Sequence, residues 1–255
     1  RPFCCISLPA TVPEKEGRLE QSHNLAILIP ALNEEETIGP LIREIPTGVA
    51  RWIIVIDNGS TDQTAQVARA AGALVVEQPQ RGYGRACWTG FQKAHALGAE
   101  IIVYMDGDGS DDPADLISML APLISGSADL VIGSRVTAKA ERNAVPAQAL
   151  LGNWLVSRLI NLRYQTQLHD VGSFRVIRSK HLSALQMHEM TFGWPVEMLV
   201  KAARADYRIQ ELPIHYRRRR AGSSKVAGNL IGSVRAAYCM LSTAMRYTTM
   251  GRVHV

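Results

Sequence analysis

The sequence predicts an α/β fold in which a mostly parallel sheet is flanked by helices. In the first half of the 255-residue chain, short apolar runs alternate with segments of helical periodicity. Continuous apolar runs are typical of strands that are buried on both faces, as in parallel sheets. Strands that alternate with helices predict a parallel sheet with helices on both sides. Because no low-complexity linker separates the two halves, we expect a single compact domain.

The expected elements follow in order along the chain. Apolar runs predict strands over residues 25–30, 52–56, 73–77, 101–105 and 129–133. Helices are expected from residue 34 onward and over 62–71, 83–97 and 113–124. Asn33 can cap the first of these, and the glutamates that follow it favour a helix N-terminus. After residue 140 the pattern changes to helices over 146–164, 195–205 and 226–247, with short strands near 173–178 and 207–217.

Composition and charge limit the function classes. Apolar residues make up 47% and charged residues 20% of the chain, which is typical of a globular protein. No apolar run reaches the roughly 18 residues that span a bilayer. Residues 201–255 hold 11 Lys and Arg against two acids, a balance of +9, so the remaining residues carry −4 of the net +5. This asymmetry suits an anionic partner or a membrane surface, whereas no nucleic-acid recognition module is present.

The cysteines and the N-terminal residues indicate where in the cell the protein is expected. Cys4, Cys5, Cys87 and Cys239 show no zinc or redox spacing, which favours a reduced cytosolic setting. Residues 1–22 lack the features of a signal peptide, and we expect them to form a flexible leader. The expected location is cytoplasmic and peripheral, at the inner face of the membrane.

An acidic cluster follows the apolar run at 101–105. Asp106, Asp108, Asp111 and Asp112 lie within seven residues. Like charges at this spacing repel one another, and a divalent cation that collects oxygen ligands would explain why they are grouped. The alternative is a solvated acidic turn that caps the next helix. The cluster sits where a strand should end, which is where open α/β sheets bind ligands.

Three strand-to-helix turns carry polar residues: 30–35, 57–62 and 106–108. In this order and spacing they resemble the turns of the family 2 glycosyltransferases, inverting enzymes that use nucleotide sugars. The resemblance implies a GT-A fold and covers about residues 25–225. It implies a nucleotide pocket lined by Pro30, Asn33, Glu35, Asp57 and Asp106, and a Mg²⁺ or Mn²⁺ ion ligated by Asp108. Gly82 is expected to let the backbone approach the nucleotide closely.

The chain more specifically resembles the polyprenyl-phosphate branch of that family, which includes dolichol-phosphate mannose synthase. The similarity lies in residues 81–86, 132–135, 170–175, 192–197 and 217–225. It implies that Arg135, Arg219, Ser224 and Lys225 bind the acceptor phosphate. The domain then divides into a nucleotide-sugar half at 23–135 and an acceptor half at 136–225, followed by an amphipathic helix and tail at 226–255.

The run Arg217–Arg220 follows an apparent strand, so alternate side chains should face opposite ways. Arg217 and Arg219 are then expected on one face, with Arg218 and Arg220 on the other. A solvated charge run is the alternative.

The last helix is amphipathic, with an expected apolar face of Val226, Leu230, Val234, Ala237, Leu241 and Met245. Packing against the protein core and lying in the membrane interface both fit this pattern.

The expected activity is metal-dependent, inverting transfer of a hexose from a nucleotide sugar to a polyprenyl phosphate. Asp106, Asp108, Arg135 and Glu197 are the expected catalytic residues. A phosphate acceptor is already anionic and needs no base, whereas a hydroxyl acceptor would require Glu197 or Asp170 as the base. Glu197 could instead only begin a helix. Transfer to a hydroxyl of a polysaccharide or glycolipid is one alternative, and a silent nucleotide-sugar-binding subunit that recruits a membrane protein is another.

Overall fold

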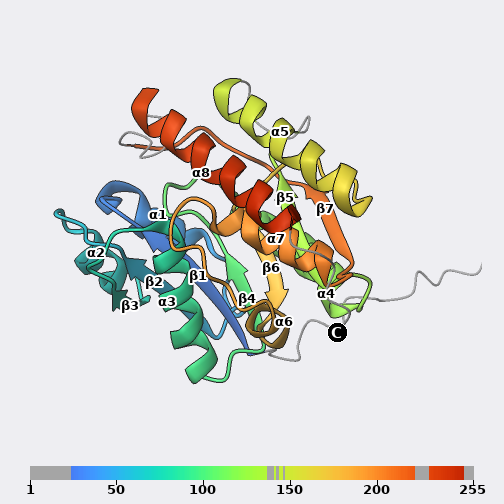
Figure 1. Ribbon diagram of the computed structural model, residues 1–255. Helices are drawn as coiled ribbons and strands as arrows, with labels where there is room; N and C mark the ends of the chain where they lie inside the picture. Colours follow the sequence, from blue (N-terminus) through green and yellow to red (C-terminus); the bar gives the residue numbers. More distant parts are fainter. Residues whose placement is uncertain (1–23, 137–140, 142–143, 146, 222–229, 250–255) are drawn as a thin grey trace, which may run out of the picture.

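The computed structural model describes residues 24–136, 141, 144–145, 147–221 and 230–249 (Figure 1). Within these residues seven strands form one mixed sheet in the order β3-β2-β1-β4-β6-β5-β7. The strands are β1 (Leu25–Ala31), β2 (Trp52–Asp57), β3 (Leu74–Glu77), β4 (Ile101–Tyr104), β5 (Leu130–Ser134), β6 (Arg175–Arg178) and β7 (Ile209–Pro213). Only β6 runs antiparallel to its neighbours. The prediction of a mostly parallel sheet is confirmed.

Helices cover both faces of the sheet (Figure 1). They are α1 (Glu35–Glu44), α2 (Thr64–Ala70), α3 (Tyr83–Ala96), α4 (Leu116–Ile124), α5 (Ala147–Tyr164), α6 (Ser179–Ala184), α7 (Trp194–Arg204) and α8 (Leu230–Thr249), with a 3₁₀ turn η2 (Pro113–Asp115) before α4. The short α6 was not predicted, because six residues are too few to show a helical period. None of the described helices is long and apolar enough to cross a membrane.

The strands consist of continuous apolar residues because the sheet has two separate cores, one on each face. In β1, Ala26 and Leu28 point to the core beneath α3, α5 and α7. Ile27 and Ile29 point to the opposite core beneath α1 and α4. Each face of a central strand therefore needs an apolar side chain, and the alternation seen in half-exposed strands is lost.

The sheet brings the polar turns to one edge. Ala31, the last residue of β1, pairs with Asp57, the last residue of β2. On the other side of β1, Leu28 pairs with Tyr104 and its carbonyl accepts the Met105 N–H (3.1 Å). Because β1, β2 and β4 are parallel neighbours, the loops that leave them meet at the carboxyl edge of the sheet.

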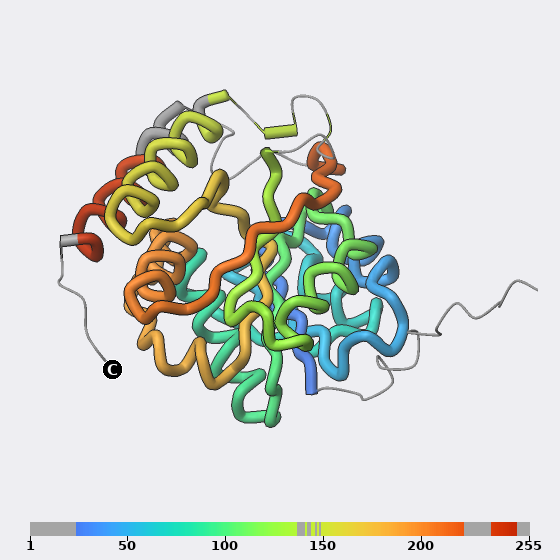
Figure 2. Tube along the Cα trace, turned by 90° about the vertical axis from the view of Figure 1, so that its right-hand side faces the viewer, coloured from blue at the N-terminus to red at the C-terminus, as the bar shows by residue number. Residues whose placement is uncertain are grey.

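The C-terminal helix α8 packs on α5 and α7 (Figure 2). Its buried residues in the described part are Ala236, Thr243, Ala244, Tyr247 and Thr248. The expected apolar face is therefore wrong, because it is rotated about the helix axis relative to the face that is buried. Met245 is exposed, while Leu241 is partly buried against the core. Small side chains on the buried face allow close approach: a Cβ atom at Gly193 would lie 2.3 Å from the Thr243 hydroxyl oxygen. Val226 lies outside the described residues, as does the leader at 1–22.

The start of α3 is fixed against a distant segment, residues 189–191. The N–H of Gly84 donates to the Thr191 carbonyl (3.1 Å), and the N–H of Arg85 donates to the Met190 carbonyl (3.0 Å). A Cβ atom at Gly84 would lie 2.2 Å from the Glu189 carbonyl oxygen. The chain therefore has room only for glycine at this crossing.

We predict that Gly84→Ala destabilises the fold by about 2 kcal/mol or more, because overpacking here moves backbone rather than a side-chain tip. The matched control is Gly152→Ala in α5, where a Cβ would meet nothing within 4 Å. That change should stabilise the protein by roughly 0.5–1 kcal/mol, since alanine is the better helix former. Urea unfolding followed by circular dichroism measures both. Equal stabilities of the two variants would contradict the close backbone contact between Gly84 and residues 189–191.

Candidate active site

The first two turns hold each other in place at the edge of the sheet. The Asn33 N–H donates to the Ser60 hydroxyl (2.9 Å), and the Asn33 side-chain oxygen accepts the Thr61 N–H (2.8 Å). Asn33 has a left-handed backbone (φ 53°), and the residue at the helix cap is Glu34. The expectation that Asn33 caps α1 is therefore wrong, because its side chain binds the neighbouring turn instead.

Other residues expected to bind the nucleotide belong to the same pair of turns. The Glu35 carboxylate accepts the Gln63 N–H (2.9 Å), and the Asp57 carboxylate accepts the Ser60 N–H (2.9 Å). Pro30 lies beside them near the end of β1. The structure thus brings Pro30, Asn33, Glu35 and Asp57 to one place, and nucleotide binding by these residues stays a prediction.

Asn58 links the second turn to the third strand-to-helix loop. It is buried, its amide group donates to the carbonyls of Gln78 (3.0 Å) and Gln80 (2.8 Å), and its oxygen accepts the Gly82 N–H (2.8 Å). Gly82 approaches Met190, whose carbonyl oxygen would be 2.4 Å from an added Cβ. The glycine at 82 is thus explained by contact with the protein's own backbone. A contact between Gly82 and the nucleotide stays a prediction.

Asp106 begins the acidic cluster and is partly buried. The Tyr83 hydroxyl donates to it (3.2 Å), and its own N–H donates to the Asp111 carboxylate (3.1 Å). Burial and the neighbouring Asp108 raise the pKa of Asp106 to about 6. Asp111 is fully buried, and burial also raises its pKa. One Asp111 oxygen, Oδ1, is buried without a hydrogen bond.

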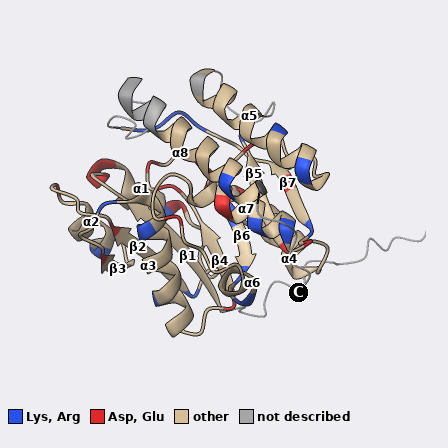
Figure 3. Ribbon diagram, viewed as in Figure 1, with Lys and Arg blue, Asp and Glu red and all other residues tan. Residues whose placement is uncertain are grey.

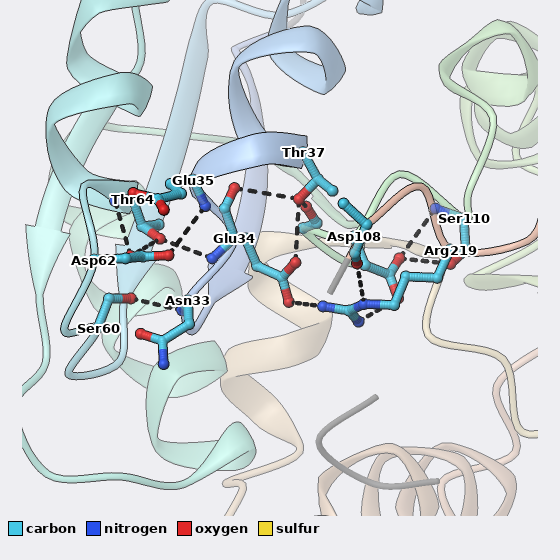
Figure 4. Close-up of polar contacts among 12 residues, drawn as sticks. Asn33, Glu34, Glu35, Thr37, Ser60, Asp62, Thr64, Asp108, Ser110 and Arg219 are labelled. Carbon is cyan, nitrogen blue, oxygen red and sulfur yellow. Dashed lines mark hydrogen bonds and ion pairs between the residues drawn. The ribbon is translucent and has the colours of Figure 1, made fainter. Parts of the chain in front are cut away.

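Asp108 is bound to an arginine from the far end of the domain (Figure 4). One of its oxygens accepts from the N–H (3.0 Å) and hydroxyl (2.6 Å) of Ser110. The other accepts from Arg219 Nη1 (3.0 Å), while Nη2 of Arg219 binds the buried carboxylate of Glu34. Arg219 therefore bridges Glu34 and Asp108. Glu34 was not predicted as a site residue, although it stands in the same turn as Asn33 and Glu35.

The acidic cluster fits a hard divalent cation. Among the described residues, no group of three or more His, Cys, Asp and Glu side chains could hold a metal ion. Mg²⁺ is usually held by one or two carboxylates and completes its shell with substrate phosphates and water. Asp106 and Asp108 supply that number. The Arg219 guanidinium on Asp108 shows that this position accepts positive charge.

Arg135 is held by a buried carboxylate. Its guanidinium makes two hydrogen bonds of 2.8 Å to Asp170, which also accepts from Asn153 of α5 (2.7 Å) and the Val171 N–H (2.7 Å). Burial opposes the charge on Asp170, but Arg135 lowers its pKa below the usual value. Arg135 also lies over the Tyr216 ring, 5.5 Å from its centre.

Glu197 lies in α7 and is fully buried. Its carboxylate accepts the N–H groups of His188 (2.9 Å) and Glu189 (2.7 Å) and pairs with Lys201 (2.7 Å). This is the geometry of an anchor that ties residues 188–189 to α7. A role for Glu197 as a base stays a prediction, and these contacts do not favour it.

The arginine run does not continue a strand, since β7 ends at Pro213. Arg217 and Arg220 both pair with Glu44, while Arg219 turns to Asp108. The expected pairing of Arg217 with Arg219 on one face is therefore wrong, because strand alternation does not apply here. Ser224 and Lys225 lie outside the described residues.

Comparison with known proteins identifies the family. The model of glycosyl transferase family 2 matches residues 26–185. An uncharacterized glycosyltransferase of Mycobacterium tuberculosis is 38% identical over 82% of this chain and 93% of its own length. The chain belongs to glycosyl transferase family 2. The expectation that the protein is a glycosyltransferase is confirmed.

Other members of the family carry more specific names. The dolichyl-phosphate hexose transferase of Haloferax volcanii is 32% identical over 85% of this chain and 94% of its own length. The dodecaprenyl-phosphate galacturonate synthase of Rhizobium johnstonii is 29% identical over 80% of this chain and 62% of its own. The predicted resemblance to the polyprenyl-phosphate glycosyltransferases is confirmed.

A solved structure confirms the GT-A fold. Glucosyl-3-phosphoglycerate synthase of M. tuberculosis, in complex with Mn²⁺, UDP-glucose and phosphoglyceric acid, superposes with a TM-score of 0.75. The match covers 96% of this chain and 86% of that one at 23% identity. At this identity the likeness concerns the fold alone.

We predict a pH-dependent contribution of Asp106 to stability in metal-free buffer. Because the pKa is raised from 3.8 to about 6 on folding, the folded protein binds more protons than the unfolded chain between these values. This contribution is present below pH 4 and lost as the pH rises through 6. The unfolding free energy of wild type minus that of Asp106→Asn should fall by roughly 2–3 kcal/mol from pH 4 to pH 7. Urea titrations in EDTA measure it, and a difference that rises over this range would contradict the assignment.

Proposed function

We propose that the protein is a metal-dependent inverting glycosyltransferase that moves a hexose from a nucleotide sugar to a polyprenyl phosphate. One observation carries the choice of acceptor. The two carboxylates considered as a base for a hydroxyl acceptor, Glu197 and Asp170, are both fully buried and bound by several donors. A phosphate acceptor needs no base. The names of the Haloferax and Rhizobium relatives support the same acceptor class.

On the donor side, the nucleotide lies against the two interlocked turns. It contacts Pro30, Asn33, Glu35, Asp57, Gly82 and Asp106. Asp108, with Asp106 beside it, would hold Mg²⁺ or Mn²⁺, and the ion would supply positive charge for the diphosphate leaving group. Tyr83 keeps the Asp106 carboxylate in position through its hydrogen bond.

On the acceptor side, Arg135, Arg219, Ser224 and Lys225 bind the phosphate. The acceptor oxygen is anionic near neutral pH, so the protein must bring two negatively charged groups together and align them. Asp170 fixes the guanidinium of Arg135 through two parallel hydrogen bonds, which orients it in advance. Arg219 lies beside Asp108 and so connects the donor and acceptor sides of the site.

The proposed location is cytoplasmic, at the inner face of a membrane, because the acceptor is a lipid. A membrane protein partner is compatible with this location. Transfer to a hydroxyl acceptor is the alternative activity, and it requires one of the buried carboxylates to act as base. A silent nucleotide-sugar-binding subunit would keep the donor contacts and lack transfer.

The acceptor is tested by comparing polyprenyl phosphate with the matching polyprenol, using UDP- and GDP-hexoses and reading nucleotide release and lipid product. We predict transfer to the phosphate alone. Asp108→Asn should abolish transfer. Glu197→Gln, which keeps the side-chain shape, should cost far less than the roughly 10²–10⁴-fold that a general base supplies.

Unfolding curves accompany each variant, because Glu197 is buried and its substitution can destabilise the fold. Transfer to polyprenol, with a loss of 10²-fold or more in a folded Glu197→Gln protein, would move the assignment to the hydroxyl acceptor. Nucleotide-sugar binding without any transfer would identify the silent subunit.

A further inference from the structure

Helix α5 is apolar on both its faces. Its inner side contributes Val156, Ile160 and Tyr164 to the core. On the outer side of a helix in a globular protein, polar residues are usual. The outer side of α5 instead exposes large apolar residues: Leu151 is 60%, Trp154 59%, Leu155 40% and Leu162 68% exposed. We call Leu151, Trp154, Leu155 and Leu162, together with the exposed Arg158 among them, the outer stripe of α5. A contiguous exposed apolar surface of this kind marks an interaction site.

The neighbouring helix also exposes large apolar side chains. In both views α8 runs beside α5 on the outside of the molecule (Figures 1 and 2). On α8, Tyr238 is 73% and Met245 55% exposed. Trp and Tyr are the aromatic residues enriched where one end of a side chain meets hydrocarbon and the other meets water.

The charge on this pair of helices is of one sign. Neither the 147–164 segment nor the 230–249 segment contains Asp or Glu, and α5 exposes Arg158 and Arg163 (Figure 3). A second copy packed on the same surface would bring arginines together without a countercharge. An anionic lipid surface offers hydrocarbon for the apolar residues and negative headgroups for the arginines.

The surface lies close to the acceptor side of the site. Asn153, on the inner side of α5, donates to Asp170, the carboxylate that holds Arg135. Trp154, the next residue, is in the outer stripe. Arg135 is therefore separated from this surface by about one helix diameter, roughly 10 Å. A phosphate carried at the headgroup level of a bilayer would have only this distance to cover.

We propose that the outer stripe of α5 docks the enzyme on an anionic lipid bilayer and thereby presents the acceptor site to the membrane. This deepens the proposed function, because it names the surface that meets the lipid. The apolar side chains insert into the bilayer, and Arg158 gives the preference for anionic headgroups.

The test is co-sedimentation of the full chain with protein-free vesicles of phosphatidylcholine, with and without phosphatidylglycerol. Wild type should bind the phosphatidylglycerol vesicles. The triple variant Leu151→Gln, Trp154→Gln, Leu155→Gln should bind roughly tenfold or more weakly, because three apolar side chains would no longer enter the bilayer. Arg158→Gln should lose about fivefold on the anionic vesicles and little on pure phosphatidylcholine.

The matched control is Ile117→Gln, which removes an apolar side chain that is 45% exposed on α4, against the opposite face of the sheet. It should bind as wild type does. Equal binding by the triple variant and wild type, or no binding to any protein-free vesicle, would overturn the proposal. So would a triple variant that converts a dimer to a monomer in sedimentation velocity without vesicles, because the stripe would then join two copies.

Vesicle binding needs neither donor nor acceptor, so it remains informative if transfer to polyprenyl phosphate is not observed. Conversely, transfer to acceptor dispersed in detergent tests the proposed function alone and should be unchanged in the triple variant. With acceptor embedded in vesicles, the triple variant should show a raised acceptor KM. Far-UV circular dichroism confirms that each variant is folded.

Discussion

The arrangement of the site depends on one interaction, the bridge that Arg219 makes between Glu34 and Asp108. Parallel strands deliver several carboxylates to one edge of the sheet, where their mutual repulsion must be offset. Arg219 supplies the positive charge, and it comes from a segment that lies more than 100 residues further along the chain than Asp108. Because Glu34 belongs to the first turn and Asp108 to the loop after β4, the same guanidinium also fixes these two loops relative to each other.

A second carboxylate–guanidinium pair, Asp170 with Arg135, is organised in a different way. Asp170 is fully buried, and its carboxylate accepts hydrogen bonds from Arg135, Asn153 and the Val171 N–H. The orientation of Arg135 is therefore determined before any ligand binds. Breaking such a pair leaves a buried charge without a partner, which is costly. Arg135 is therefore held by one buried carboxylate, whereas Arg219 is shared between Glu34 and Asp108.

The sequence allowed much of this to be predicted, because the relevant signals are local. Apolar runs at 25–30 and 52–56 predicted buried parallel strands, and the polar residues after them predicted turns at a common edge. The contacts that define the site are not local. Glu34 looks like one of three similar glutamates until Arg219 is placed beside it. Asn58 looks like an ordinary turn residue until its bonds to Gln78, Gln80 and Gly82 are seen. The expected face of α8 was rotated because the buried face includes small residues, such as Ala236 and Ala244, that a hydrophobicity pattern does not single out.

We propose that the acidic cluster binds a divalent cation and that Arg219 provides the countercharge when no metal is bound. Titration of Mn²⁺ into the nucleotide-free protein, followed by calorimetry, tests it most directly in wild type, Arg219→Gln and the control Arg220→Gln, whose arginine pairs with Glu44 instead. Removing the cation from Asp108 should tighten Mn²⁺ binding in Arg219→Gln by about tenfold, on the scale of one charge-assisted contact, and leave Arg220→Gln close to wild type. Unchanged or weaker Mn²⁺ binding in Arg219→Gln would contradict the account.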